Sequence, residues 1–387
     1  MSLITWLPRL RCAMLRLPNA DSEIHNSCGV VATTPLGTSA GHARATAVAP
    51  SATTTAPVAA AMNSTARCGY AATASRDYFI GLSVMLHSLY HVSSSSSSDC
   101  RVLLLLWHPS LPDTDLLPWQ REHLTCVAGR HTEVRWQQVD DQRLAVWRRV
   151  PVARPSALKA LLKLELLFLE ATPALNAVAF FDSDFLVLKR PGFIWPDVSA
   201  ANGTRWKLHG SCSMWPGTRA VCPRHLNTGF FALSLPAPAP LRTFLGLAVA
   251  NFTARGKVAK NGDQTVLMHA LDNWHLAARG RAKHKRKLPR PHSLWIHRDW
   301  WLNYRPRTAA HISSWQAVHW QGTAKPCSSA LRGPFDTGME RAIPELRGLW
   351  LDECRRLANS ACAETQSQKE RVLGSLEGVC SNSSMRR

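Results

Sequence analysis

The stretch AVAFFDSDFLVLKRPG (residues 177–192) places two carboxylates, Asp182 and Asp184, directly after an apolar run. Such a run is typical of a strand buried on both faces of a parallel sheet, and ligands of these sheets bind at the carboxyl ends of the strands. A buried carboxylate without a partner is very costly, so the two acids need a cation, a hydrogen-bond cage or solvent. We expect a strand over Val178–Phe181 that ends at Asp182.

Strand and helix patterns alternate on both sides of this stretch. Residues 69–92 predict a short strand, a turn near Ser75–Asp77 and an amphipathic helix. Further strands are predicted at 101–107, 132–139, 229–235 and near 317–326, with helices over 156–171 and from about Pro240 and Asp263, and a loop over 195–223. This order predicts an open α/β sheet with right-handed crossovers.

Composition divides the chain of 387 residues into three parts. Residues 1–66 are rich in Ala, Thr, Ser and Pro and are expected to form a disordered leader or linker. The hydrophobic content of 45% is enough for one large core, which we expect within residues 67–350. Residues 351–387 are expected to form a C-terminal tail tied by a disulfide.

The cysteines and sequons favour an oxidising compartment. Eleven cysteines are many for a cytosolic chain, and the pairs Cys212–Cys222 and Cys354–Cys362 are close enough in sequence to close small disulfide loops. N-x-[ST] sequons occur at Asn63, Asn202, Asn251 and Asn382. We therefore expect the secretory pathway. The first twenty residues contain three arginines and no acid, so organelle targeting is the alternative to a simple terminus. They include no clear transmembrane segment.

The formal net charge of +20 is compatible with nucleic acid, anionic glycans or membrane surfaces as partners. The densest basic stretch, residues 279–292, has the prolines and the lack of apolar spacing of an exposed loop or a basic address signal. Because no nucleic-acid-binding signature accompanies the charge, we expect no specific nucleic acid partner.

Carboxylates in an Asp-x-Asp turn after a buried strand suit a hard divalent cation such as Mg²⁺ or Mn²⁺. The pattern alone is common, and it occurs a second time at Asp113 and Asp115. Three further segments follow the Asp182–Asp184 turn in order: LNTGFFALSL (226–235), NGDQTVLMHAL (261–271) and HWQGTAKPC (319–327).

Together these four motifs resemble family 8 of the glycosyltransferases, over the region from Cys68 to Cys327. The resemblance implies a single GT-A domain, which is a Rossmann-like fold with a mostly parallel open sheet. It also implies a retaining enzyme that uses Mn²⁺ or Mg²⁺ and moves a hexosyl or glucuronosyl unit from a UDP-sugar to a glycan or other hydroxyl acceptor. Such an enzyme of the secretory pathway is expected in the Golgi lumen.

The resemblance also assigns roles to single residues. Asp182, Asp184 and His319 match the metal ligands. Thr73 and Tyr78 match nucleotide contacts, and Lys163 matches a lysine of the helix that precedes the metal motif. Asn227 and Gly229 match the segment that faces the sugar. Asp263 and Gln264 match the pair beside the anomeric carbon. Lys325, which follows an expected turn at Gly322, matches the cation that contacts the diphosphate.

Other interpretations of the same residues stay open. His319 by itself could be a core histidine, Lys163 an exposed helix residue and Asp263 a helix N-cap. Lys260 and Asn261, before the Asp-Gln pair, depart from the family pattern. A basic residue there is compatible with a carboxylated donor such as a uronic acid or with a different path of the loop. The alternatives to a transferase are a haloacid-dehalogenase-type phosphatase with Asp182 as nucleophile and a basic glycan-binding module without turnover.

Overall fold

The computed structural model describes residues 67–93, 100–111, 113–129, 132–154, 156–189, 208–212, 226–278, 294–297, 301–302, 316–320, 345–360 and 362. All of them belong to one compact unit, Met62–Arg387. The predicted leader, Gly322, Lys325 and the basic stretch 279–292 lie outside the described residues.

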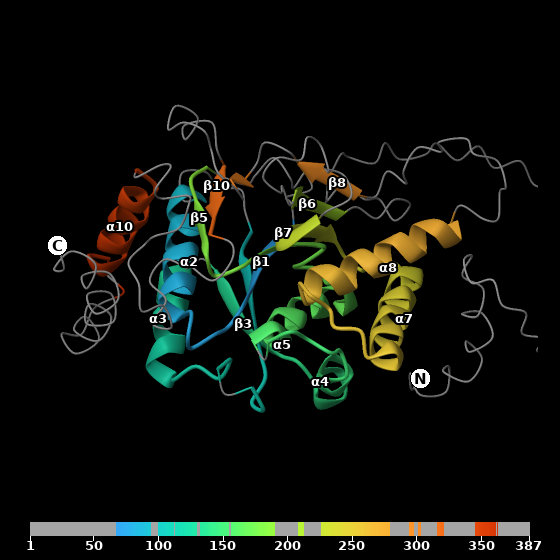
Figure 1. The fold of residues 1–387 in the computed structure, drawn as a ribbon. Helices are drawn as coiled ribbons and strands as arrows, with labels where there is room; N and C mark the ends of the chain where they lie inside the picture. Colours follow the sequence, from blue (N-terminus) through green and yellow to red (C-terminus); the bar gives the residue numbers. More distant parts are fainter. Residues whose placement is uncertain are drawn as a thin grey trace, which may run out of the picture. The chain divides into compact units, whose positions relative to one another are not determined.

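A seven-stranded sheet forms the centre of this unit (Figure 1). Its strands are β1 (Cys68–Thr73), β2 (Val102–Trp107), β3 (Glu133–Gln138), β4 (Ala177–Phe181), β6 (Leu208–Cys212), β7 (Leu226–Ser234) and β8 (Leu294–His297). They lie in the order β3-β2-β1-β4-β7-β6-β8, and β7 runs antiparallel to both of its neighbours while the other pairs are parallel. The predicted α/β class and mostly parallel sheet are confirmed.

Helices cover both faces of the sheet. One face carries α2 (Phe79–Ser93), α3 (Pro118–Ala128) and α10 (Glu345–Ala358), and the other carries α4 (Asp141–Arg148), α5 (Ser156–Leu161), α7 (Ala239–Arg255) and α8 (Asp263–Ala278). In β4, Ala179 and Phe181 pack toward α2, whereas Val178 and Phe180 pack toward α7 and α8. Successive side chains of a strand point to opposite faces, so an uninterrupted apolar run is what this sandwiched strand requires.

A second, three-stranded sheet stands beside the end of β4. It contains β5 (Phe185–Val187), β10 (Ala317–His319) and β9 (Trp301–Leu302), in the order β5-β10-β9. β5 pairs antiparallel with β10, so a segment that directly follows the acidic turn meets a segment from far along the chain.

Three sequence predictions about the fold need correction. The helix expected over 156–171 is α5 followed by a 3₁₀ helix, η2 (Leu162–Phe168). The loop expected over 195–223 contains β6, which joins the main sheet. The strand expected over 229–235 begins earlier, at Leu226.

The small disulfide loop that the spacing of Cys354 and Cys362 allows does not form. Cys362 forms a disulfide with Cys126 of α3, and Cys68 forms one with Cys100. Cys354 is a free, buried thiol on α10, where burial raises its pKa to about 12. The pair Cys212–Cys222 lies outside the described side chains.

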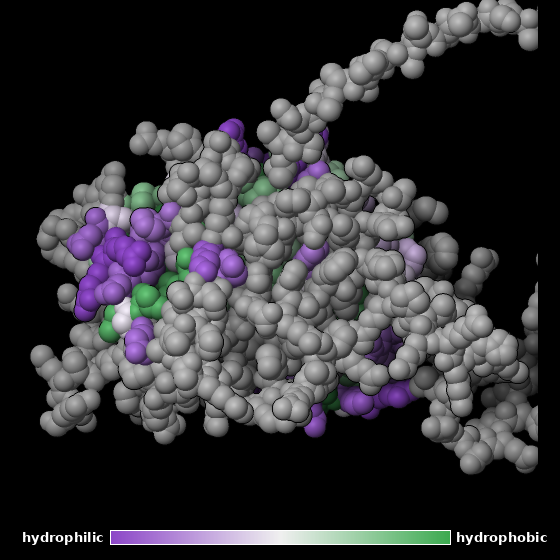
Figure 2. Space-filling view, turned by 90° about the horizontal axis from the view of Figure 1, so that it is seen from above, coloured by the Kyte–Doolittle hydropathy of each residue, from purple (hydrophilic) through white to green (hydrophobic). Residues whose placement is uncertain are grey.

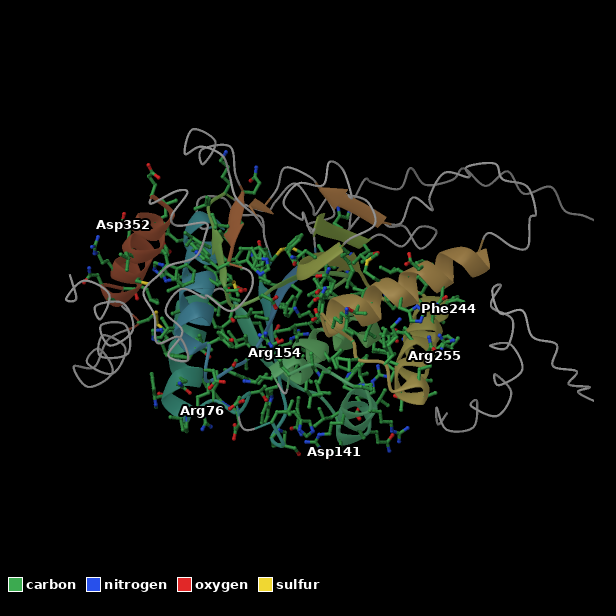
Figure 3. All side chains as sticks on the ribbon, viewed as in Figure 1. Arg76, Asp141, Arg154, Phe244, Arg255 and Asp352 are labelled. Atoms are coloured by element: carbon green, nitrogen blue, oxygen red, sulfur yellow. A yellow bond between two sulfur atoms is a disulfide. The ribbon has the colours of Figure 1, made fainter. Side chains whose placement is uncertain are left out.

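Many charged side chains of this unit lie at its surface. Among them, the labelled Arg76, Asp141, Arg255 and Asp352 are exposed and lie toward the rim of the view in Figure 3, and hydrophilic colour gathers on the side of α10 (Figure 2). Within the described ranges no helix combines the length and the apolar character needed to cross a bilayer.

Candidate metal centre and sugar-nucleotide site

The acidic turn joins β4 to β5. β4 ends at Phe181, and the backbone N–H of Asp182 donates a hydrogen bond to the carbonyl of Gly229 on β7 (2.8 Å). β5 begins at Phe185, so Asp182 and Asp184 occupy the short turn at the carboxyl end of a buried strand. This is the position that the sequence predicts.

The pairing of β5 with β10 brings His319 to this turn. His319 is the register partner of Phe185, and the two rings stack with centroids 4.2 Å apart and an interplanar angle of 13°. Next to it, the backbone N–H of Trp320 donates to the carbonyl of Asp184 (3.1 Å). The main chain therefore fixes the imidazole beside the acids.

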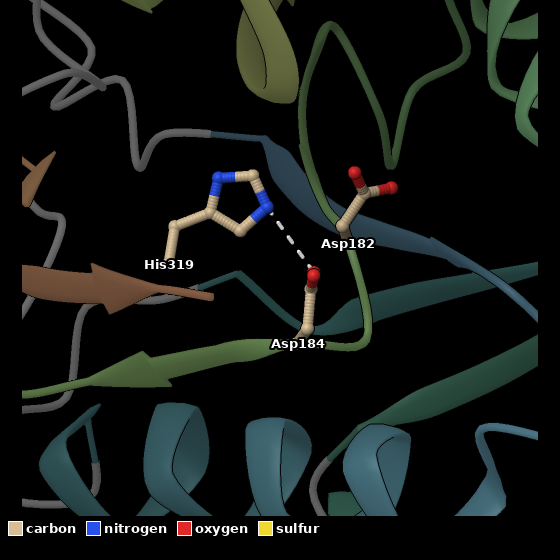
Figure 4. Close-up of side chains that lie close together, drawn as sticks. All are labelled: Asp182, Asp184 and His319. Atoms are coloured by element: carbon tan, nitrogen blue, oxygen red, sulfur yellow. Dashed lines mark ion pairs between the residues drawn. The ribbon is translucent and has the colours of Figure 1, made fainter. Parts of the chain in front are cut away.

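Asp182, Asp184 and His319 form the one group of metal-ligating side chains found in the described part of the chain (Figure 4). One ligand atom from each lies within 4.8 Å of the other two, and His319 Nε2 is 3.2 Å from an oxygen of Asp184. Asp184 and His319 are buried, whereas the Asp182 side chain is 33% exposed. Two carboxylates and one imidazole, with one carboxylate partly exposed, are a donor set that fits a divalent cation such as Mn²⁺.

Gly229 leaves the space that the imidazole occupies. A Cβ atom at this position would lie 2.2 Å from Cε1 of His319 and 2.8 Å from its Nε2, distances that no real Cβ contact shows. The side chain of Asn227 accepts a hydrogen bond from the Gly229 N–H (2.7 Å) and so holds this part of β7 in place. The glycine in the sequence NTG is thus explained by close packing against the histidine.

Lys163 joins the acidic turn to a third carboxylate. Its Nζ lies 2.7 Å from Asp182 and 3.2 Å from Asp263, and it donates to the carbonyl of Thr228 (3.1 Å). The side chain is 2% exposed, so the interpretation of Lys163 as an exposed helix residue is wrong. Asp263 is also the first residue of α8, but its contact with Lys163 makes it part of the same cluster.

Burial and charge act in opposite directions on this cluster. Burial alone would lower the pKa of Lys163, but the negative charges of Asp182 and Asp263 and their hydrogen bonds outweigh it, so the pKa is raised. The pKa of Asp182 is also raised, because burial and the neighbouring Asp184 outweigh the stabilising charge of Lys163. Lys163 therefore carries its charge inside the protein, held by two acids.

The predicted nucleotide contacts lie at the same edge of the sheet. β1 pairs with β4 with Ala71 opposite Phe180, which puts Thr73, the last residue of β1, level with the acidic turn. Tyr78 is half-buried just before α2. The hydroxyls of Thr73 and Ser75 are buried without a hydrogen-bond partner among the described residues. The sequence does not predict a site residue at Ser75, since a serine in a turn gives no sequence signal of its own.

The remaining predicted residues are divided between this site and regions beyond the described residues. Gln264 is half-buried in the first turn of α8, next to Asp263. Gly322 and Lys325 follow β10 but lie outside the described residues. The structure thus brings together Lys163 and the three aspartates with His319, packed on Gly229.

No protein-family model and no curated protein match this sequence. Solved structures that resemble the chain include several glycosyltransferases. The galactosyltransferase LgtC in complex with donor and acceptor sugar analogs is 15% identical with a TM-score of 0.45, over 73% of this chain and 95% of that chain. The bifunctional glycosyltransferase WbbM is 12% identical with a TM-score of 0.47, over 80% and 51%. Mouse xyloside xylosyltransferase 1 is 12% identical with a TM-score of 0.40, over 65% and 97%.

Proposed function

We propose that this protein is a metal-dependent, retaining glycosyltransferase of the GT-A type, which moves a hexosyl or glucuronosyl unit from a UDP-sugar to a glycan or other hydroxyl acceptor. The observation that carries the proposal is the cluster at the end of β4, in which Asp182, Asp184 and His319 converge while Lys163 connects Asp182 to Asp263. The order of motifs along the sequence supports the same class of enzyme.

In this proposal Mn²⁺, or Mg²⁺, is held by the carboxylates of Asp182 and Asp184 and by Nε2 of His319. When bound, the metal neutralises charge on the diphosphate of the departing nucleotide. The imidazole in the donor set favours Mn²⁺, because Mg²⁺ in proteins prefers oxygen ligands.

The chain's own residues supply the remaining functions. Lys163 pairs with Asp263 and fixes its orientation, so that this carboxylate acts as a nucleophile or as electrostatic support for an oxocarbenium-like transition state, with Gln264 beside it. Asn227 and Gly229 face the sugar. Lys325, which follows the turn expected at Gly322, adds a second positive charge on the diphosphate.

The nucleotide is assigned to the end of β1, where Tyr78 offers an aromatic face to the base and Thr73 a buried hydroxyl. Lys260 is exposed near the start of α8. If this lysine faces the sugar, its positive charge would pair with the carboxylate of a donor such as UDP-glucuronate. Two disulfides support an oxidising location such as the Golgi lumen.

The test is release of UDP from a panel of UDP-sugars by the full chain with Mn²⁺. We expect the wild-type protein to hydrolyse at least one donor slowly and Asp184→Asn to lose at least about 100-fold in rate, which corresponds to about 2.7 kcal/mol of lost stabilisation. Asp115→Asn, in the other Asp-x-Asp turn, is the matched control and should keep the wild-type rate. Faster release of UDP from UDP-glucose than from UDP-glucuronate would exclude the hypothesis of a carboxylated donor.

Two results would favour the alternatives. A phosphoryl group trapped on Asp182 would indicate a phosphatase, in which His319 has no assigned role. Salt-dependent glycan binding without turnover of any UDP-sugar would indicate a binding module. Equal UDP release by wild type and Asp184→Asn would exclude a metal role for this turn.

A further inference from the structure

Helix α2 touches the main chain of the acidic turn at a glycine. A Cβ atom built on Gly81 would lie 2.6 Å from the carbonyl oxygen of Ser183, the residue between the two metal-ligating aspartates. Contacts this short do not occur for real Cβ atoms, and the neighbour is backbone, which cannot swing away as a long side chain does. The helix therefore approaches the turn as closely as it does only because residue 81 has no side chain.

A second contact connects the same helix to β5. The hydroxyl of Ser88 accepts a hydrogen bond from the backbone N–H of Val187 (3.1 Å) and donates one to the carbonyl of Met85 within α2 (2.8 Å). Ser88 is 2% exposed. Residues seven apart in a helix lie on the same face, so Gly81 and Ser88 present one face of α2 to the two ends of the segment 183–187.

The opposite side of the turn is held by β10. The N–H of Trp320 donates to the carbonyl of Asp184 (3.1 Å), and Phe185 is paired with His319. The main chain between Ser183 and Asp184 is thus clamped between α2 on one side and the strand that carries the histidine on the other. A shift of the Ser183 carbonyl moves the Asp184 carboxylate relative to both other ligands.

We propose that Gly81 and Ser88 are positioning residues of the metal centre, and that α2 serves as the rigid surface against which the two carboxylates are aligned. This inference rests on the proposed metal-dependent function. Neither residue offers a side chain to the metal, so their effect passes through the backbone of the turn. Groups that orient metal ligands from the next layer of residues typically change metal affinity by about 10–100-fold when they are replaced.

The experiment is a titration of the full chain with Mn²⁺, in which free Mn²⁺ is measured by electron paramagnetic resonance. Gly81→Ala is compared with Gly246→Ala in α7, where an added Cβ meets nothing within 4 Å. Both substitutions replace a glycine inside a helix, so both gain similar helix propensity. We expect the Kd for Mn²⁺ to rise about tenfold or more in Gly81→Ala and to stay at the wild-type value in Gly246→Ala.

A merely structural defect gives a different result. Partial unfolding of Gly81→Ala would lower the amount of Mn²⁺ bound at saturation without changing Kd, and that result would overturn the inference. If Gly81→Ala does not fold, Ser88→Ala decides, with an expected rise in Kd of about threefold to tenfold and a contrary result of unchanged Kd. A wild-type chain that binds no Mn²⁺ overturns the proposed function itself, whereas equal Kd values in all folded variants overturn only the role of α2.

Discussion

Two Asp-x-Asp turns in this chain have different environments. In the first, Asp113 lies 2.7 Å from Lys159 and Asp115 lies 2.8 Å from Arg121, and both carboxylates are about half exposed, at 49% and 46%. The residue between them, Thr114, points inward and its hydroxyl donates to a backbone carbonyl. The two acids pair with two different cations, so this turn holds two separate, partly exposed ion pairs.

In the second turn, Asp182–Asp184, the carboxylates are more buried and converge with a third one. Asp184 is 6% exposed and faces His319, and Asp182 shares one lysine with Asp263. Among the described residues, three carboxylates therefore meet around one lysine and one imidazole in a partly buried place. Carboxylates removed from water need positive partners, and a bound divalent cation supplies such a partner. Identical sequence patterns differ here in burial and in whether their carboxylates converge.

One lysine near each turn bridges two carboxylates, so the two lysines can be compared directly. Lys159 in α5 bridges Asp77 and Asp113, which are 52% and 49% exposed. Lys163, one helical turn later in η2, bridges Asp182 and Asp263, which are 33% and 9% exposed. Both lysines make the same type of contact, and burial is the main difference between them.

The largest expected effect comes from removing these lysines one at a time. Lys163→Met leaves two acids in a buried place without their shared cation and should reduce the free energy of unfolding by about 3–5 kcal/mol. Lys159→Met breaks contacts with half-exposed acids and should cost only about 1 kcal/mol. Urea unfolding monitored by circular dichroism measures both. Equal losses would mean that the two turns do not differ in the way we describe.

A smaller effect is expected from filling the space beside His319. Gly229→Ala pushes a methyl group into the imidazole and should destabilise the protein by about 1–3 kcal/mol, the usual cost of overpacking. Gly246→Ala is again the control, because its added methyl group meets nothing within 4 Å. Thermal unfolding measures the difference, and a Gly229→Ala protein as stable as Gly246→Ala would show that the imidazole lies elsewhere.

The smallest effect should come from the first turn. Asp113→Asn removes one charge from an exposed ion pair, so the free energy of unfolding should change by less than about 1 kcal/mol. Release of UDP should not change. Denaturant unfolding and the UDP assay test this together, and a loss of more than about 2 kcal/mol would show that the first turn is more than a surface contact.

Much of the fold and part of the site follow from the sequence. The uninterrupted apolar run before Asp182 indicates a strand with both faces covered, and β4 is such a strand, with α2 on one side and α7 on the other. The strand predicts the place of the acids, since its carboxyl end is where the turn must begin. Local patterns were enough for this conclusion because both signals lie within a few residues.

Other features depend on contacts between distant segments. The meeting of His319 with Asp184 follows from the pairing of β5 with β10, and the sequence indicated it only through the family resemblance. The disulfide between Cys126 and Cys362 joins positions 236 residues apart, and disulfide connectivity cannot be deduced from sequence spacing. β6 was missed because its five residues, LHGSC, include a glycine and lack clear alternation.

The central claim is that one divalent cation binds between Asp182, Asp184 and His319. Crystals of the full chain grown with Mn²⁺ and UDP, measured at the manganese absorption edge, test it most directly. The account predicts one anomalous peak in contact with all three side chains, which disappears in Asp184→Asn. A peak at Asp113 and Asp115, or none near His319, would contradict it.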